Sequence, residues 1–566
     1  MVEGTQYAIF VDAGSSGTRM YGYQWEHQTV DDNIIINEIF KYQSAHKGGI
    51  QTLGLDVVLD SENPDDSLDT RVKARVEVYF NALVSKHFFS QKRVKITTAE
   101  GQSNLPEYFE WRDSFETADK TTTEKGNVKT TVELDSPPTV QTLHSSKNKK
   151  NYTLTVMATG GMRDYREQSF EAFNLLETAV ETYIASLDST FKSATYQTIT
   201  GKEEALYGWA ASNYLLRKLP TLGIKNGLVN YLEMGGATAQ IAFRTHVYKQ
   251  LKAGGANPNP TAFAKKLMRV HIWGEEIDLY LRTYPLGSVS ALATHETAVQ
   301  HLPGWDTIDP CKPGRWAGDL VKRDNQGKKT GGGNVSAAGL DNFNYARCKQ
   351  LSGLLLRYQM FKLGTTDLED NETYPKPGKA LPAVGVAEPV NLLNGSPGLT
   401  SRSQFVGGAN FYYTTRSTFG RDDWGHPKEM AHNYLLLDKE VKDRAELSFD
   451  HQIIASKKNT LDPVDKEFLV NGIFTAAWVI AVLKGFGIWE GENEINFQPY
   501  NGPIKDKIDH RPELSWTLGA AFIDACNLGR SDQEKVLQVV DSNGAHNYIS
   551  GYHSEDADGR LLDRLN

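Results

Sequence analysis

Residues 7–18, which read YAIFVDAGSSGT, decide the fold of this chain. The apolar, β-prone run YAIFV (Tyr7–Val11) predicts a buried strand that ends at Asp12. The small residues that follow predict a tight turn, and the alternating aromatic residues of YGYQW (21–25) predict a returning strand. We therefore expect a hairpin whose tip is built from small residues and whose first strand ends in a carboxylate.

A second hairpin of the same kind follows much later in the chain. Leu228–Met234 is predicted to be a buried strand with Glu233 near its end. Residues 235–238 (GGAT) supply the small-residue turn, and residues 240–243 are predicted to return as a strand. The theme of strand, acidic residue, turn and strand thus occurs twice in the chain.

A third apolar strand ends in a turn and a helix instead of a hairpin. Leu154–Met157 runs into the small-residue turn of residues 158–163 (ATGGMR), and apolar residues from Phe170 to Leu187 then recur at helical spacing. The same spacing predicts helices elsewhere, at residues 72–83, at 470–483 and within 513–526.

Both hairpin turns have the composition of a phosphate site. Small side chains let a phosphate approach the backbone, whose N–H groups can converge on an anion, and hydroxyl groups add donors. The carboxylates of Asp12 and Glu233 cannot bind phosphate because like charges repel, so we expect them to hold a divalent cation or its water shell. Two such turns that face each other would bind a polyphosphate from both sides. Either turn alone is also explained as an ordinary hairpin that uses glycine for its backbone geometry.

Composition excludes several classes of protein. The chain has 566 residues, enough for several domains at about 100–200 residues each. Its net charge of −9 argues against a nucleic-acid-binding protein, and its 39% of hydrophobic residues argues against bulk disorder. No apolar stretch reaches the roughly 20 residues of a membrane span, and no CxxC motif is present for a cysteine-type metal site.

Two segments are expected to lie outside the core. Residues 101–150 are rich in Thr, Lys, Glu and Ser and poor in aliphatic residues, which predicts a peripheral insertion that could hold irregular strands. Residues 323–344 contain three consecutive glycines (331–333) and are predicted to be a surface loop.

Residues 201–209 (GKEEALYGW) begin a predicted helix with two adjacent carboxylates. Neighbouring residues on a helix point in different directions, so only one of Glu203 and Glu204 can face a cleft. A carboxylate beside a bound polyphosphate could orient or deprotonate an attacking water, whereas an acidic first turn could equally serve the helix dipole. Arg163 also has two interpretations, and we favour its pairing with a structural carboxylate over the neutralisation of phosphate.

Together these residues resemble a known family. The segments VDAGSSGTR (11–19), ATGGMR (158–163), GKEEALYGWAASNYLL (201–216), LEMGGATAQIAF (232–243) and FVGGANFYYTT (405–415) are similar, in this order, to the five apyrase-conserved regions of the nucleoside triphosphate diphosphohydrolases, the apyrase or ecto-nucleotidase family. The resemblance implies an α/β fold of two actin-like (ribonuclease H-like) lobes with a nucleotide cleft between them. We expect one lobe to comprise residues 1–192 and about 517–566, with the insertion at about 101–150, and the other lobe about 193–516.

The resemblance also implies an activity and its residues. The expected reaction is hydrolysis of the terminal phosphate of nucleoside tri- and diphosphates by in-line attack of water, assisted by Mg²⁺ or Ca²⁺. By position, Glu204 is implied as the catalytic base, Thr238 and Gln240 as residues that place the water, and Asp12 and Glu233 as holders of the metal's waters. The implied phosphate-binding residues are Ser15, Ser16, Gly17, Thr18, Thr159, Gly160, Gly235, Gly236 and Ala237, and the implied base-binding residues are Tyr412, Tyr413, Lys484 and Phe486. Because aromatic stacking accepts any base, we expect broad base tolerance.

The chain departs from the family's usual pattern at several positions. Glu233 and Met234 stand where the family usually has Asp and Leu, and the longer acid could alter the metal distance or the choice of metal. Gly160, Ala205 and Thr238 are further replacements that keep the chemistry possible.

The three cysteines bear on the location of the protein. Cys311 and Cys348 match one disulfide pair of the family, which favours an oxidising compartment, whereas the state of Cys526 stays open. The chain thus looks like a soluble, secreted bacterial or protozoan member, extracytoplasmic, with its signal peptide not included in this sequence. We expect a monomer or weak oligomer with no nucleic-acid partner and no membrane span.

Other functions of the same fold stay open at this point. A sugar or acyl kinase would use the same turns with an acceptor in place of water. An exopolyphosphatase would cleave inorganic chains and need no base pocket. A non-enzymatic filament or a chaperone-type ATPase would show assembly with little turnover.

Overall fold

The computed structural model describes the segments of the chain that carry its secondary structure. These are residues 6–28, 33–44, 48–54, 67–85, 91–98, 108–111, 120–125, 128–134, 152–216, 227–245, 267–272, 275–301, 309–311, 320–323, 329–333, 345–362, 392, 404–419, 434–445, 463–488, 496–499, 512–527, 537–540 and 546–547.

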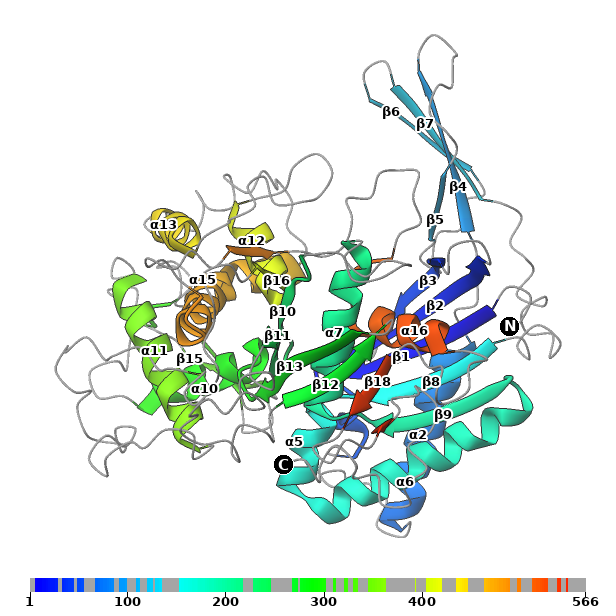
Figure 1. Cartoon of the computed structure of the whole chain (residues 1–566). Coiled ribbons are helices and arrows are strands. Elements are labelled where there is room, and N and C mark those ends of the chain that lie inside the picture. Colours follow the sequence, from blue (N-terminus) through cyan, green and yellow to red (C-terminus); the bar gives the residue numbers. More distant parts are fainter. Residues whose placement is uncertain are drawn as a thin grey trace, which may run out of the picture. The chain divides into compact units, whose positions relative to one another are not determined.

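The chain divides into two compact units (Figure 1). The first consists of residues 1–228, 268–277 and 502–566, and the second of residues 229–267 and 278–501. The first unit thus extends beyond residue 193, where we expected the second lobe to begin, and it includes the helix of residues 201–215.

The first unit is built on a five-stranded mixed sheet in the order β3-β2-β1-β8-β9. Its strands β1, β2 and β3 are antiparallel neighbours, whereas β1, β8 and β9 run parallel. The predicted first hairpin is confirmed, because β1 and β2 pair from Gln6 opposite Trp25 to Gly14 opposite Gly17. The bounds of the strands are β1 (Gln6–Gly14), β2 (Gly17–Gln28), β3 (Asn33–Gln43), β8 (Tyr152–Ala158) and β9 (Ser193–Thr198).

Alternate residues of β1 point to opposite faces of this sheet. Ile9, Val11 and Ala13 belong to a hydrophobic core shared with α2 (Leu68–Ser85) and α6 (Phe170–Ser186). Asp12 therefore points to the opposite face. The other helices of this unit are α5 (Gly160–Gln168), the short 3-10 helix η1 (Leu187–Ser189), α7 (Gly201–Leu215) and α16 (Trp516–Asn527).

Helix α16 is tied to the sheet and packs closely on α7. The hydroxyl of Tyr23 in β2 lies 3.0 Å from Oγ1 of Thr517, and α7 buries most of its circumference, as expected for a helix enclosed by protein. A Cβ atom on Gly519 would overlap the carbonyl group of Tyr207. The two helices can therefore approach each other only because residue 519 has no side chain.

The second unit repeats the sheet of the first. Its strands follow the order β17-β16-β10-β11-β13, in which β10, β11 and β13 are antiparallel neighbours and β10, β16 and β17 run parallel. Three antiparallel strands followed by two parallel ones is the arrangement of the first sheet as well, and the predicted α/β fold of two related actin-like lobes is confirmed. The bounds are β10 (Asn230–Met234), β11 (Ala239–Thr245), β13 (Glu275–Tyr284), β16 (Gln404–Ala409) and β17 (Asn496–Pro499).

Helices cover the core of the second unit. Trp478 is fully buried in the middle of this core, and its indole N–H donates to the carbonyl of Leu286 at 3.0 Å. The expected helix at 470–483 is confirmed as part of α15. The helices are α10 (Ser288–His301), α11 (Tyr345–Lys362), α12 (Asn410–Phe419), α13 (Tyr434–Ala445) and α15 (Pro463–Gly485).

Two segments form small sheets that are separate from the two larger ones. The expected insertion at 101–150 contributes to a separate antiparallel sheet in the order β5-β4-β7-β6 (Figure 1). The expected surface loop at 323–344 is wrong in part, because β15, which includes the three glycines, pairs with β14. Without side chains to pack, the glycines still offer their backbone N–H and C=O groups to a neighbouring strand. The bounds are β4 (Gln91–Thr98), β5 (Tyr108–Trp111), β6 (Lys120–Lys125), β7 (Val128–Leu134), β14 (Leu320–Arg323) and β15 (Lys329–Gly333), and the first unit also holds β12 (Leu267–Ile272), β18 (Leu537–Val540) and β19 (His546–Asn547).

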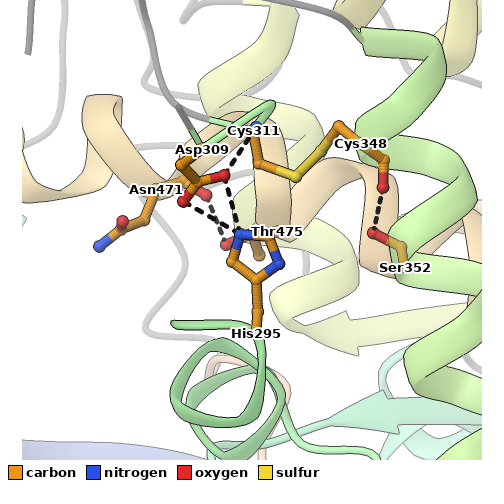
Figure 2. Close-up of a disulfide and its surroundings, with 7 residues drawn as sticks. All are labelled: His295, Asp309, Cys311, Cys348, Ser352, Asn471 and Thr475. Carbon is orange, nitrogen blue, oxygen red and sulfur yellow. Dashed lines mark hydrogen bonds and ion pairs between the residues drawn. A yellow bond between two sulfur atoms is a disulfide. The ribbon is translucent and has the colours of Figure 1, made fainter. Parts of the chain in front are cut away.

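The predicted disulfide between Cys311 and Cys348 is present in the second unit (Figure 2). It closes a span of 37 residues, for which the loop-entropy model gives about 4 kcal/mol of stabilisation. Asp309 accepts a hydrogen bond from the backbone N–H of Cys311 at 2.8 Å and lies 3.0 Å from Nε2 of the buried His295. Cys526 is a buried free cysteine.

Among the helices that the structure describes, none is both long and apolar enough to cross a bilayer.

The contact between α7 and α16 yields a stability prediction. We expect Gly519→Ala to lower the free energy of unfolding by about 1–3 kcal/mol, because the added methyl group forces the helices apart. Gly472→Ala is the matched control, because a Cβ there meets open space within α15 and alanine should stabilise the helix by about 0.5–1 kcal/mol. Urea unfolding of both variants measures the effects, and a Gly519→Ala variant as stable as the wild type would contradict the close packing.

Candidate functional site

The first small-residue turn is held from several sides. Gln51 donates from Nε2 to the carbonyl of Ser15 at 2.9 Å, and a Cβ on Gly49 would overlap the carbonyl oxygen of Gly14. Ser15 is half-buried and Ser16 is exposed at the tip, whereas the predicted phosphate-binding residue Thr18 is fully buried in β2. Thus Ser15, Ser16 and the backbone of the tip are the parts of this turn that a ligand can reach.

Asp12 ends the first strand as a buried carboxylate. It is 9% exposed, and its Oδ2 lies 3.5 Å from Nη1 of Arg19, its partner across the hairpin. Burial raises the pKa of Asp12 to about 6, because the opposing effect of Arg19 is incomplete and the negative charge of Glu204 adds to the increase. A hard divalent cation would compensate for this cost, so the residues fit the expected Mg²⁺ or Ca²⁺.

Thr159 and Gly160 begin α5 directly after β8. The backbone N–H of Thr159 lies 3.4 Å from the carbonyl oxygen of Ala13, which joins this turn to the first hairpin. The Thr159 side chain makes no capping bond to its own helix, so its hydroxyl is not used in the role that a threonine at a helix N-terminus usually serves. Gly160 is buried. The N-terminus of α5 therefore lies beside the first small-residue turn.

The two adjacent carboxylates of α7 have different roles. Glu203 forms a capping box with Thr200, in which each side chain binds the other residue's backbone N–H, at 2.7 and 3.2 Å. Glu204 is only 6% exposed and does not take part in this cap. The helix-end interpretation therefore holds for Glu203 and leaves Glu204 as a buried carboxylate in the same unit as Asp12.

Arg163 fixes the position of Glu204. Its Nη2 donates to Oε2 of Glu204 at 2.7 Å, and its Nη1 donates to the carbonyl of Ile199 at 2.7 Å. Because a guanidinium is planar, these two bonds fix the direction of the carboxylate relative to the start of α7. The pairing that we favoured from the sequence is thus observed, and the carboxylate involved is the one expected to be the catalytic base.

The second small-residue turn is shaped by the N-terminus of α10. The backbone N–H groups of Ser288, Val289 and Gly287 donate to the carbonyls of Gly235, Gly236 and Ala237, respectively, at 2.9–3.0 Å. In a trans peptide the N–H points away from the C=O. The N–H groups of residues 236–238 therefore point away from α10, as an anion site requires.

The carboxylate of this second turn has a hydrogen-bond partner. Tyr231 donates to Oε2 of Glu233 at 2.7 Å. Gln240 pairs with Glu233 across the hairpin, as Arg19 pairs with Asp12 in the first. Gln240 is buried and its Nε2 donates to Oγ1 of Thr238 at 2.8 Å. The structure thus brings Thr238 and Gln240 together.

The four expected base-binding residues differ in exposure. Phe486 is 1% exposed and its ring packs on Tyr284 in the core, and Tyr412 is 3% exposed. Tyr413 is half-buried, and burial lowers the pKa of the half-buried Lys484. The side chain of Tyr413 is therefore the aromatic group of this set with ring surface left for a base.

Some functional candidates did not follow from the sequence patterns. Arg19 could have been found from the hairpin register, because a tight turn after Asp12 places it opposite that residue. Gln51 has no such signal, because it lies in a segment without a recognisable motif. The N-terminus of α10 also has no signal in the sequence, since its role depends on how the chain returns from β13 to the second small-residue turn.

Comparison with known proteins adds a family and several relatives. Residues 142–362 match the profile of the GDA1/CD39 (nucleoside phosphatase) family. The chain is 24% identical over 543 residues to Golgi apyrase of Schizosaccharomyces pombe, and the match covers 92% of this chain and 76% of that protein. It is 25% identical over 248 residues to human ectonucleoside triphosphate diphosphohydrolase 3, and this match covers 42% of this chain and only 33% of that protein. A solved structure of nucleoside triphosphate hydrolases from Neospora caninum aligns with a TM-score of 0.49 and 13% identity over 92% of each chain.

The buried carboxylate of Asp12 yields a pH prediction. In the folded chain Asp12 keeps its proton up to about pH 6, whereas an unfolded Asp releases it near 3.8, so this group makes stability fall as pH rises through that window. At about 1.4 kcal/mol per pKa unit, the effect is on the order of 3 kcal/mol. We expect Asp12→Asn, compared with wild type by urea unfolding in EDTA, to gain stability by that order between pH 4 and pH 7. Parallel stability curves would contradict the burial of an uncompensated carboxylate.

Proposed function

We propose that this chain, whose residues 142–362 match the GDA1/CD39 (nucleoside phosphatase) family, removes the terminal phosphate of nucleoside tri- and diphosphates. The protein is an enzyme of nucleotide phosphate hydrolysis, in keeping with the apyrases and diphosphohydrolases among its relatives. The observation that carries the more specific proposal is the buried Glu204, which Arg163 orients in the same unit as Asp12.

Glu204 acts as the general base. As a water oxygen attacks the terminal phosphorus in line, Glu204 accepts a proton from that water, and the bond to the bridging oxygen of the remaining nucleotide breaks. Arg163 keeps the carboxylate in one direction through its bond of 2.7 Å, so little reorganisation is needed in the transition state. Orientation of this kind supports hydrolysis without a covalent phosphoenzyme.

Each unit contributes one small-residue turn as a proposed phosphate-binding element. In the first unit, Ser15, Ser16, Thr159 and the backbone of the tip are the proposed donors. In the second unit, the N–H groups of residues 236–238 are proposed to point at the phosphates, because α10 holds the carbonyls on the other side. Thr238 and Gln240, which are hydrogen-bonded to each other, help to place the water.

Mg²⁺ or Ca²⁺ is the proposed cofactor. Asp12 and Glu233 would hold the ion through its waters, since each is a carboxylate at the end of a strand beside a small-residue turn. When bound, the ion neutralises charge on the phosphate groups. Glu233 already accepts a hydrogen bond from Tyr231, which fixes one of its oxygens.

We also propose a lumenal or extracytoplasmic location. A disulfide persists in an oxidising compartment, and Cys311 and Cys348 form one in the core of the second unit. Among the relatives are proteins named for the Golgi.

The role of Glu204 is tested by a pair of neighbouring substitutions. We expect Glu204→Gln to lower kcat by about 100-fold to 10,000-fold, the usual contribution of a general base, while a non-hydrolysable nucleoside triphosphate still binds in calorimetry. The matched control is Glu203→Gln, which removes the adjacent carboxylate but leaves an oxygen to accept the capping bond from Thr200, and should keep turnover. Equal activity of both variants would remove Glu204 from the base role.

Base tolerance gives a second test of the proposed function. Stacking on an aromatic ring such as Tyr413 accepts purines and pyrimidines, whereas hydrogen bonds to base edges discriminate. Phosphate release from ATP, GTP, CTP and UTP, and from the corresponding diphosphates, should therefore differ little among bases. A profile restricted to a single base would contradict stacking as the main base contact.

A further inference from the structure

Asn410 connects α12 to the second small-residue turn. Its side-chain Nδ2 donates to the carbonyl of Met234 at 2.8 Å and lies 3.2 Å from the carbonyl oxygen of Gly235. These carbonyls lie at the point where β10 becomes the turn. The carbonyl of Gly235 also accepts from Ser288 of α10, so α12 and α10 together hold this peptide.

The backbone before Asn410 is in an uncommon conformation. Ala409 has a φ of +49°, and it is the one non-glycine residue with positive φ in the part of the chain that the structure describes. Such a conformation costs about 1 kcal/mol or more and persists where the surroundings impose it. Here it occurs at the residue that places Asn410 over the turn.

The internal repeat shows that the same connection exists in the first unit. Ala409 pairs with Met234 as Ala158 pairs with Ala13, so Asn410 corresponds to Thr159. In the first unit the backbone N–H of Thr159 approaches the carbonyl of Ala13. In the second unit the side chain of Asn410 binds the corresponding carbonyl, that of Met234. Different groups thus make the same connection in both units.

We propose that Asn410 is a positioning residue for phosphate binding, which it assists by fixing the peptides at the start of the second turn. With the carbonyl of Gly235 held by Asn410 and α10, the N–H of Gly236 points the other way, toward the proposed phosphate. This inference rests on the proposed function in assigning a phosphate to the turn. Asn410 itself touches neither substrate nor metal in this account.

Aspartate separates this role from simple helix stabilisation. In the first turn of a helix Asp is at least as favourable as Asn, because it suits the helix dipole and the exposed N–H groups. At the turn, however, a carboxylate cannot donate and would repel two carbonyl oxygens. Asn410→Asp should therefore preserve α12 and disturb the turn, whereas Asn410→Ala only removes the donor.

The experiment compares Asn410→Asp and Asn410→Ala with Thr418→Val as the control. Thr418 is buried in the same helix, and its hydroxyl binds only the local carbonyl of Thr414 among the bonds described. We expect kcat/KM for ATP to fall at least about 10-fold in the alanine variant and further, by about 100-fold or more, in the aspartate variant, because misaligned backbone donors stabilise the transition state poorly. Thr418→Val should stay within about twofold of wild type. An aspartate variant as active as wild type would overturn the proposal.

Hydrogen exchange keeps the test independent of activity. In both Asn410 variants the amides of residues 235–238 should exchange faster than in Thr418→Val, measured in the absence of nucleotide. Unchanged exchange would overturn the positioning role even if activity fell. A wild-type protein that releases no phosphate from ATP would instead refute the proposed function, and faster exchange in the variants would still support the structural role of Asn410.

Discussion

Buried negative charge in the first unit is the constraint on which the rest of the structure depends. Asp12 and Glu204 both lie below 10% exposure within the first unit. Burial of a carboxylate is costly unless cations or donors compensate for it. Arg163 compensates for Glu204 through a short ion pair, whereas Arg19 compensates only in part for Asp12, whose pKa stays raised. Part of the buried negative charge of the first unit therefore stays uncompensated, and a divalent cation with its phosphate ligand would compensate for it.

The two units hold their small-residue turns in place with different groups. Each unit places a carboxylate before a small-residue turn and a helix N-terminus after the neighbouring parallel strand. The first turn is held by Gln51 and the second by α10 and Asn410. What the two units share is a set of hydrogen-bonded carbonyls, and we propose that the backbone N–H groups of each turn bind an anion.

Local sequence patterns predicted the secondary-structure elements. The arrangement of the candidate site, in contrast, depends on contacts between residues that are distant in sequence. The apolar run Tyr7–Val11 and the turn after it predicted the hairpin because both signals are local. Which of Glu203 and Glu204 is free for chemistry could not be read from adjacent positions, since the answer depends on the cap at Thr200 and on Arg163. Glycine-rich composition wrongly suggested a loop at β15, because pairing with β14 depends on a partner strand and not on the segment itself.

We propose that the small-residue turn of each unit binds phosphate groups of the same nucleotide. A crystal structure with a non-hydrolysable nucleoside triphosphate and Mg²⁺ tests it most directly. We predict that backbone N–H groups of the tip at Ser15–Ser16 and of residues 236–238 lie within hydrogen-bond distance of the same polyphosphate, with Glu204 facing the terminal phosphorus across one water. Phosphates that contact only one turn, or a Glu204 that points away from the nucleotide, would contradict it.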